Sequence, residues 1–227
     1  MGNNPGQKEI LKGIEAAVFD FDGTLAVLNI DFPAMRGAVR KLAAESGVPT
    51  EVLDDLFVLE TVERGREWLA GKSPDRAASF HRVAMDLISG IEIRAARDGS
   101  LFEGIRELLE GMKKRKIRRA IITRNCGAAV TMIFPDIADY CEVFLPRDEV
   151  DRVKPDPGHV LDPLMKMAIV PARAIMVGDH PMDIRTGREA GTRTIGVLTG
   201  SGGREELLRA GADIIVPSAP DLLPLLA

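Results

Sequence analysis

The sequence predicts an α/β fold in which a doubly wound parallel sheet forms the core and a small α-helical unit is inserted into it. Two observations carry this prediction. Short continuous apolar runs alternate with helix-like segments along most of the chain, and such runs are typical of strands buried on both faces. Between Leu25 and Ser100, in contrast, the pattern is helical only, which predicts a separate helical unit.

Six apolar runs are expected to form the strands of the sheet. The first, Ala16–Phe19, leads directly into the polar segment Asp20–Thr24. The others are residues 119–122, 141–145, 174–177, 194–198 and 213–216. Between the first two lies Phe102–Lys116, where apolar residues recur at helical spacing, so a helix is expected there. The repeated order of strand and helix predicts the doubly wound sheet.

Three helices are expected in the insertion. Pro33 lies in the first turn of one, which ends near Gly47, and a second is expected over Val52–Leu69. The third has Ser73 as its N-cap and runs through Ile93. We therefore expect a core of residues 1–27 and 98–227 and a helical cap of residues 28–97. A connection this long generally has a functional reason, such as a lid.

Composition narrows the class of protein. The 227 residues are 45% hydrophobic and 28% charged, with a formal charge of −4, which excludes a disordered or collagen-like chain. No stretch reaches the roughly 18 apolar residues of a membrane span, and residues 1–7 lack an apolar signal region, so we expect a cytoplasmic protein without a membrane partner. Two cysteines and three histidines are too few and too scattered for a structural zinc site. Aromatic residues are only 4% of the chain, which argues against a nucleic-acid partner.

Polar side chains stand where the buried strands are expected to end. The carboxyl ends of parallel strands line the ligand crevice of an open α/β sheet, so these groups should converge. Carboxylates gathered there repel one another unless a cation compensates them, and oxygen ligands without a cysteine or histidine set favour Mg²⁺. The residues are Asp20 and Asp22 after the first strand, Thr123 after the second, Lys154 beyond the third, and Asp179 and Asp183 after the fourth.

A Mg²⁺ site of this kind points to phosphate chemistry. Mg²⁺ usually takes one or two carboxylates together with phosphate oxygens of the substrate. A carboxylate nucleophile can form an aspartyl-phosphate, and a lysine can neutralise charge on the transferring group. The Thr123 hydroxyl can bond a phosphate oxygen, and Asp22 could protonate the leaving oxygen and later deprotonate water.

Four segments, Asp20–Thr24, Thr123, Lys154–Pro157 and Gly178–Asp183, resemble in order and spacing the motifs of the haloacid dehalogenase superfamily. With the helical insertion after the first motif, the chain is similar to the phosphoglycolate-phosphatase-like subgroup. The resemblance implies a Rossmann-like core and a small cap that opens and closes over it.

The resemblance also implies roles for individual residues. Asp20 would be the nucleophile, Asp22 the general acid and base, and Lys154 the charge-neutralising residue. We expect substrate phosphate to be bound by Thr123 and Lys154 together with Arg124 and Asn125. The expected metal site consists of Asp20, Asp22 through its backbone carbonyl, Asp179 and Asp183, with Asp183 supporting either the metal or Lys154.

The predicted function is a Mg²⁺-dependent phosphatase that hydrolyses a small phosphorylated metabolite through an aspartyl-phosphate. A phosphomutase of the same fold, acting on a sugar phosphate, is the closest alternative. A 2-haloacid dehalogenase is disfavoured because it does not need a second acid at Asp22, and a phospho-receiver module is disfavoured by the order of the motifs. A monomer and a homodimer both remain open.

Other features are given more ordinary interpretations. The basic run 113–119 is interpreted as a solvated helix end, where cations complement the helix dipole. The segment Gly200–Gly203 is interpreted as an ordinary surface connection. Cys126 is either reactive or, more commonly for such thiols, buried and inert. Five cap residues could touch the substrate, namely Arg64, Arg66, Lys72, His81 and Arg82.

Overall fold

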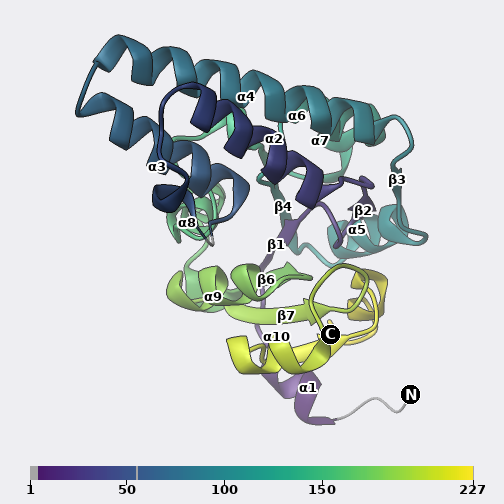
Figure 1. Cartoon of the computed structure of the whole chain (residues 1–227). Helices are drawn as coiled ribbons and strands as arrows, with labels where there is room; N and C mark the ends of the chain where they lie inside the picture. Colours follow the sequence, from purple (N-terminus) through teal and green to yellow (C-terminus); the bar gives the residue numbers. More distant parts are fainter. Residues whose placement is uncertain (1–4, 55, 227) are drawn as a thin grey trace. The chain divides into compact units, whose positions relative to one another are not determined.

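The chain divides into two compact units, which are described separately. The computed structural model describes residues 5–54 and 56–226 (Figure 1). One unit, here called the sheet unit, consists of Met1–Leu28 and Gly99–Ala227. The other, the helical unit, is Asn29–Asp98.

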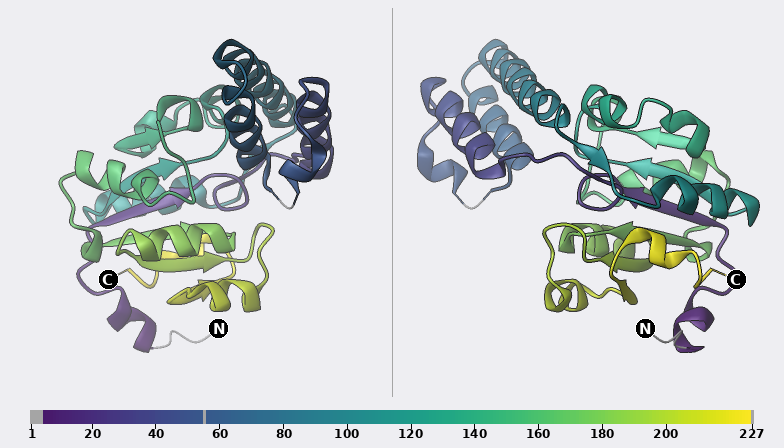
Figure 2. Two further views of the ribbon diagram at one scale, coloured as in Figure 1. Left: turned by 60° about the vertical axis from the view of Figure 1, so that its left-hand side comes forward. Right: turned by 90° about the vertical axis from the view of Figure 1, so that its right-hand side faces the viewer.

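The sheet unit contains a six-stranded sheet in which every pair of neighbours is parallel. Its order is β5-β4-β1-β6-β7-β8, so the first strand lies in the middle between β4 and β6. Helices flank the sheet (Figure 2), and the predicted fold class is confirmed. The strands are β1 (Ala16–Asp20), β4 (Arg118–Ile122), β5 (Val143–Leu145), β6 (Ala174–Gly178), β7 (Arg193–Val197) and β8 (Ile214–Val216).

The central strand is buried along its whole length, as its continuous apolar sequence predicts. Alternate side chains of a strand point to opposite faces, and Ala16 and Val18 share one face with Ala120 and Ile122 of β4. This face packs against Leu164 and other apolar residues of the helix Gly158–Lys166 (α8). The helices of the unit are α1 (Pro5–Ile10), α5 (Ile105–Lys114), α6 (Gly127–Ile133), α7 (Ile137–Tyr140), α8 (Gly158–Lys166), α9 (Pro181–Glu189) and α10 (Arg204–Ala210), with 3₁₀ turns η2 (Arg147–Glu149), η3 (Pro171–Arg173) and η4 (Ala219–Leu222).

Five of the six expected strands lie within one residue of their observed bounds, but the strand expected over 141–145 is shorter. Cys141 donates its backbone N–H to the carbonyl of Ile137 and so closes α7, and β5 begins only at Val143. The helix expected over Phe102–Lys116 is also shorter at both ends. It begins after Gly104, whose φ of 80° is left-handed, and ends before Arg115.

A second, two-stranded sheet was not expected, because the segment between Leu25 and Ser100 shows only a helical pattern. β2 (Ala26–Val27) pairs antiparallel with β3 (Ser100–Leu101). Strands of two residues are too short to give a recognisable sequence period. The pair lies where the chain leaves the sheet unit and where it returns.

The helical unit contains α2 (Phe32–Glu45), η1 (Thr50–Leu53), α3 (Val58–Ala70) and α4 (Pro74–Ala96). Ser73 caps α4 as predicted, since its Oγ accepts the N–H of Arg76 at 3.4 Å. The single helix expected over Val52–Leu69 is wrong. The backbone is extended at Asp54 (φ −68°, ψ 142°) and again at Phe57 (φ −67°, ψ 169°), which separates η1 from α3. Helical spacing of apolar residues continues through this interruption, so periodicity alone could not reveal it.

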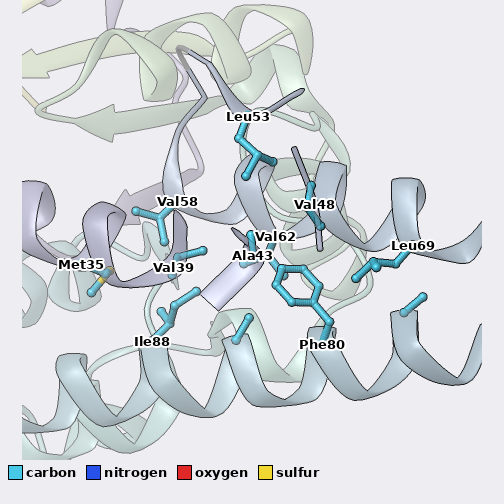
Figure 3. Close-up of a cluster of buried hydrophobic side chains, with 12 residues drawn as sticks. Met35, Val39, Ala43, Val48, Leu53, Val58, Val62, Leu69, Phe80 and Ile88 are labelled. Atoms are coloured by element: carbon cyan, nitrogen blue, oxygen red, sulfur yellow. The ribbon is translucent and has the colours of Figure 1, made fainter. Parts of the chain in front are cut away.

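An apolar cluster forms the interior of the helical unit (Figure 3). Phe80 of α4 lies directly against Gly65 of α3, where a Cβ atom would approach the phenyl ring to 2.8 Å. The glycine therefore allows the two helices to approach closely at this point. The cluster consists of Met35, Val39, Ala43, Val48, Leu53, Val58, Val62, Leu69, Ala77, Phe80, Ala84 and Ile88.

Within residues 5–54 and 56–226, no helix has the length and apolar character needed to cross a membrane.

Candidate active site

The predicted site residues of the sheet unit stand at the carboxyl ends of neighbouring strands. Asp20 is the last residue of β1 and is in register with Ile122, the last residue of β4, so Thr123 lies one position beyond it. Asp179 directly follows β6, on the other side of β1. The parallel topology thus brings segments separated by about a hundred residues to one edge of the sheet.

Lys154 forms ion pairs with two of the carboxylates, those of Asp20 and Asp183. Its Nζ lies 2.6 Å from Asp20 Oδ1 and 2.6 Å from Asp183 Oδ1. The Lys154 and Asp183 side chains are each only 2% exposed. Charged groups this deeply buried need partners, because removal from water costs several kcal/mol per ion. Asp183 Oδ2 accepts the N–H of His180 at 3.0 Å, which fixes the carboxylate at the start of α9.

Asp20, Asp179 and Asp183 form a carboxylate cluster. Each offers an oxygen, and these oxygens all lie within 4.8 Å of one another. Among residues 5–54 and 56–226, the cluster places three carboxylates around the ammonium group of Lys154, so its ionised form has a deficit of positive charge. Hard oxygen donors and this charge deficit fit a divalent cation such as Mg²⁺.

The pKa values of the cluster residues reflect the same deficit of positive charge. Burial raises the pKa of Asp20 well above its usual value, and the neighbouring Asp183 and Asp179 raise it further although Lys154 lowers it. Burial also raises the pKa of Asp179, with Asp183 as the second cause. Burial opposes the charge of Lys154, but Asp183 and Asp20 outweigh it and raise the lysine pKa. The cluster therefore favours an additional positive charge.

Asp22 lies just beyond the carboxylate cluster. Its Oδ1 accepts the backbone N–H of Leu28 at 3.1 Å. The three mutually close side-chain oxygens come from other aspartates, so the expectation that Asp22 binds metal rests on its backbone carbonyl. Gly23 follows with φ +79°, and a Cβ there would lie 2.7 Å from the Asp179 carboxylate, so only glycine fits this turn.

The predicted phosphate-binding residues form the loop after β4. Thr123 Oγ1 accepts the N–H of Asn125 at 3.1 Å, and both residues are buried. The Asn125 carbonyl accepts the N–H of Arg147 at 3.1 Å, which anchors the loop. The Arg124 guanidinium donates to Met182 Sδ in α9 at 2.9 Å.

Comparisons with known proteins identify the family. The model of the haloacid dehalogenase-like hydrolase family matches residues 17–197, more than half of the chain. The chain belongs to this family. The predicted family and the predicted enzyme class are confirmed.

Several relatives of this hydrolase are named as phosphatases. An N-acetylmuramic acid 6-phosphate phosphatase of Pseudomonas aeruginosa is 29% identical over 220 residues, which cover 94% of this chain and 95% of that protein. A phosphoglycolate phosphatase of Nitrosospira multiformis is 25% identical over 211 residues, covering 90% and 92%. A crystal structure of a predicted phosphoglycolate phosphatase from Haemophilus somnus has a TM-score of 0.66 at 19% identity, covers 96% of this chain and 100% of that one, and supports the fold alone.

Sequence reasoning missed His159 of the hydrolase. The residue is fully buried, its Nδ1 accepts the Lys154 N–H at 3.2 Å, and its Nε2 lies 3.1 Å from the carbonyl of Leu145. These partners assign a neutral ring with its proton on Nε2. Burial, with Lys154 as a second cause, lowers the His159 pKa to about 4. No sequence signal distinguished it, because the three histidines were considered only as zinc ligands.

The interpretation of Gly200–Gly203 as an ordinary surface connection is wrong. Ser201 donates its backbone N–H to Asp179 Oδ2 at 2.8 Å, and its Oγ lies 3.3 Å from the same oxygen. The loop therefore belongs to the site. Ser201 and Asp179 are 22 positions apart, so their proximity could be found only from the pairing of β6 with β7.

The basic run 113–119 is only partly a solvated helix end. Lys113 and Lys114 lie in the last turn of α5, as expected. Arg118 and Arg119 belong instead to β4, and the buried Arg119 lies 3.0 Å from Glu142. Arg118 and Arg119 are therefore part of the sheet and not of a solvated helix end.

Cys126 and Cys141 are both buried, which favours the inert alternative for Cys126. Burial raises the Cys141 pKa to about 12.

A cavity of about 340 Å³ is lined by Arg193 at the amino end of β7, away from the strand ends that carry the site, and by Ala172, Arg188, Gly191, Thr192 and Asp213.

Three of the five basic cap candidates have close partners inside the helical unit. Arg66 and His81 both reach Glu63, at 2.7 Å and 3.2 Å. Lys72 lies over the ring of Trp68, 3.4 Å from its centroid. The more distant pairs of Arg64 with Glu67 and of Arg82 with Asp86 are each 3.9 Å long. Substrate contact by any of the five stays a prediction.

Proposed function

We propose that the chain is a Mg²⁺-dependent phosphatase that hydrolyses a small-molecule phosphomonoester through an aspartyl-phosphate on Asp20. The observation that carries this proposal is the buried cluster in which Lys154 lies 2.6 Å from both Asp20 and Asp183, with Asp179 beside them. A nucleophilic carboxylate, a fixed cationic side chain and a charge deficit suited to a divalent cation are what phosphoryl transfer requires.

In the first step an Asp20 carboxylate oxygen attacks phosphorus, and the bond from phosphorus to the ester oxygen breaks. Asp22, protonated at this stage, gives its proton to the leaving oxygen. In the second step Asp22 takes a proton from water, and the water oxygen attacks phosphorus. The bond to Asp20 breaks, which releases inorganic phosphate and regenerates both carboxyl groups. The Asp22 hydrogen bond to the Leu28 N–H would hold the carboxyl group in place between the two steps.

Mg²⁺ would be held by Asp20, Asp179 and the Asp22 backbone carbonyl, with Asp183 supporting it or Lys154. When bound, it supplies positive charge that lets an anionic phosphate approach ionised carboxylates. Lys154 would neutralise charge on the transferring phosphoryl group. The Thr123 hydroxyl and Asn125 would bond its oxygens, and Arg124 is the further candidate for substrate binding.

Residues 28–97 would act as the cap over a core of residues 1–27 and 98–227, and would select the substrate. Phosphorylated sugar acids and phosphoglycolate are the first candidates, because relatives of similar length are named for N-acetylmuramic acid 6-phosphate and phosphoglycolate. Both are small, anionic phosphomonoesters. The phosphomutase alternative differs only in the acceptor, a second sugar hydroxyl in place of water.

A panel assay tests the proposal. The purified chain is incubated with para-nitrophenyl phosphate, phosphoglycolate, N-acetylmuramic acid 6-phosphate, sugar phosphates and pyrophosphate, in Mg²⁺ and in EDTA, and released phosphate is measured. We expect Mg²⁺-dependent phosphate release. Isomerised sugar phosphate without released phosphate would establish the mutase instead, and no turnover of any compound would refute both.

Asp20→Asn is the decisive variant, and Asp139→Asn is its matched control. Asp139 is an exposed carboxylate of α7, which precedes the amino end of β5 and so lies at the opposite edge of the sheet. We expect kcat to fall by at least about a thousandfold in Asp20→Asn, since the covalent step is lost, and to stay unchanged in Asp139→Asn.

A further inference from the structure

The loop that follows β7, residues 199–203, is hydrogen-bonded to Asp179. β7 is the neighbour of β6 in the sheet, so its carboxyl end lies next to Asp179. The Ser201 N–H donates to Asp179 Oδ2 at 2.8 Å, and the Ser201 Oγ lies 3.3 Å from the same oxygen. Two donors on one oxygen fix the rotation of the carboxylate.

Two glycines of the loop pack against Asp179 so closely that no side chain fits. A Cβ at Gly200 would lie 2.0 Å from Asp179 Oδ2, and a Cβ at Gly202 would lie 2.1 Å from the Asp179 carbonyl oxygen. A Cβ at Gly203 would meet only Glu206 Oε2, at 3.5 Å, which is ordinary contact. Glycine is therefore required at the positions of this loop that pass close to Asp179, namely Gly200 and Gly202, and not at Gly203.

The same loop also holds the turn that follows the nucleophile strand. The Thr199 hydroxyl donates to the carbonyl of Gly23 at 2.6 Å, across 176 positions of sequence. From that turn, Thr24 Oγ1 donates to Asp179 Oδ1 at 3.3 Å. Asp179 thus lies between two loops that are hydrogen-bonded to each other, and its Oδ2 accepts two hydrogen bonds whereas its Oδ1 accepts one.

We infer that residues 199–203 are a positioning element for the metal site, which holds Asp179 so that Oδ1 is presented to the cation. This inference rests on the proposed Mg²⁺ site. Ser201 and Gly200 are positioning residues, since they act through Asp179. A carboxylate already fixed in the binding orientation loses less conformational freedom when the cation binds, so the loop raises metal affinity. Through Thr199, the loop also couples the metal ligand to the turn between Asp22 and Thr24.

The test compares Gly200→Ala with its matched control Gly203→Ala in the full-length chain. Mn²⁺ serves as the probe, and its dissociation constant is measured from the electron paramagnetic resonance signal of free Mn²⁺. We expect the dissociation constant to rise by about 10- to 100-fold in Gly200→Ala, the usual effect of removing support from a metal ligand, and to change less than about twofold in Gly203→Ala. A wild-type dissociation constant in a folded Gly200→Ala would overturn the inference.

Two variants of Ser201 test the inference if Gly200→Ala fails to fold. Ser201→Ala removes only the hydroxyl and should weaken Mn²⁺ binding a few-fold, because the backbone N–H still donates. Ser201→Thr keeps a hydroxyl and should restore the affinity. Equal affinity in Ser201→Ala and the wild type, with Gly200→Ala unfolded, would also overturn the inference.

Failure of this inference and failure of the proposed function give different results. A wild-type chain that binds Mn²⁺ but hydrolyses nothing in the panel contradicts the function, while a Gly200→Ala effect on binding would still support the loop's role. A chain that hydrolyses phosphomonoesters, and whose Gly200→Ala variant binds Mn²⁺ normally, contradicts only the loop's role. Absence of Mn²⁺ binding in the wild type contradicts both the loop's role and the proposed metal dependence.

Discussion

The interior of the helical unit and the carboxylate cluster of the sheet unit are both buried, but they contribute to stability in opposite ways. The cluster around Phe80 is entirely apolar, and the nearby pair of Arg66 and Glu63 stays about half exposed. The carboxylate cluster buries Lys154 with Asp20 and Asp183, and the pKa of Asp20 is raised by its surroundings. Removing a group from the apolar interior should cost folding free energy, whereas removing the charge of Asp20 or Asp179, whose pKa values are raised, should increase stability and abolish function.

The largest effect is expected at Phe80. Phe80→Ala leaves a cavity where the ring packs against Gly65, and should lower the free energy of unfolding by about 3–5 kcal/mol. Val83→Ala, at a position of the same helix that is 38% exposed, should change it by no more than about 0.5 kcal/mol. Urea unfolding measures both. Equal effects of the two substitutions would show that the apolar interior does not stabilise the unit as described.

His159 should make the sheet unit sensitive to acid. Its pKa is lowered from 6.5 to about 4 in the folded chain, so between these values the unfolded chain binds more protons. Stability is therefore lost as pH falls from about 6.5 to about 4, by about 3 kcal/mol for this group.

The measurement is the free energy of unfolding of the wild type and of His159→Gln at several pH values between 7 and 4. Glutamine does not titrate, so the difference between the two proteins should shrink by about 3 kcal/mol over this range. A constant difference would show that His159 is not buried in its neutral form.

Asp20→Asn should raise the melting temperature of the metal-free protein by a few degrees near neutral pH. The reason is that burial and the neighbouring carboxylates disfavour the ionised form of Asp20, so its folded pKa lies above 3.8. Wild-type stability falls as pH rises through that folded pKa, and the advantage of the variant should vanish as pH falls toward 3.8. Thermal unfolding in EDTA checks this. A lower melting temperature for Asp20→Asn would mean that Lys154 stabilises the carboxylate more than burial opposes it.

The smallest effect is expected for the exposed charges of the helical unit. Arg82 and Asp86 of α4 are 3.9 Å apart and about 70% exposed, so a double-mutant cycle to alanine should give a coupling energy below about 0.5 kcal/mol. A coupling above about 1 kcal/mol would show that exposed ion pairs of the helical unit stabilise the fold, contrary to the account.

The main strands and the position of the candidate site could be predicted because both follow from local pattern. A run such as Ala16–Phe19 is long enough to show that both faces are buried, and in a parallel sheet the residues after each run must meet at one edge. That is why Asp20, Thr123, Lys154 and Asp179 could be selected from sequence. β2 and β3 have only two residues each, and local pattern gives no information at that length.

The support around the site could not be predicted, because it depends on contacts between distant positions. Thr24 reaches Asp179 across 155 positions, and Thr199 reaches Gly23 across 176. Glycines in a loop indicate only a turn until the neighbouring strand is placed, and only then does Gly200 prove to be confined by Asp179. A buried neutral histidine such as His159 likewise has no sequence signature of its own.

The central claim is that the carboxylate cluster is a divalent cation site, and the thermal response to Mg²⁺ tests it most directly. Melting temperatures of the wild type and of Asp179→Asn are measured in EDTA and in excess Mg²⁺. At a free Mg²⁺ concentration 100-fold above its dissociation constant, the wild type should gain about 2.7 kcal/mol, or about 5–10 °C. Asp179→Asn should melt above the wild type in EDTA and respond little to Mg²⁺. An equal response of both proteins, or no response of the wild type, would contradict the account.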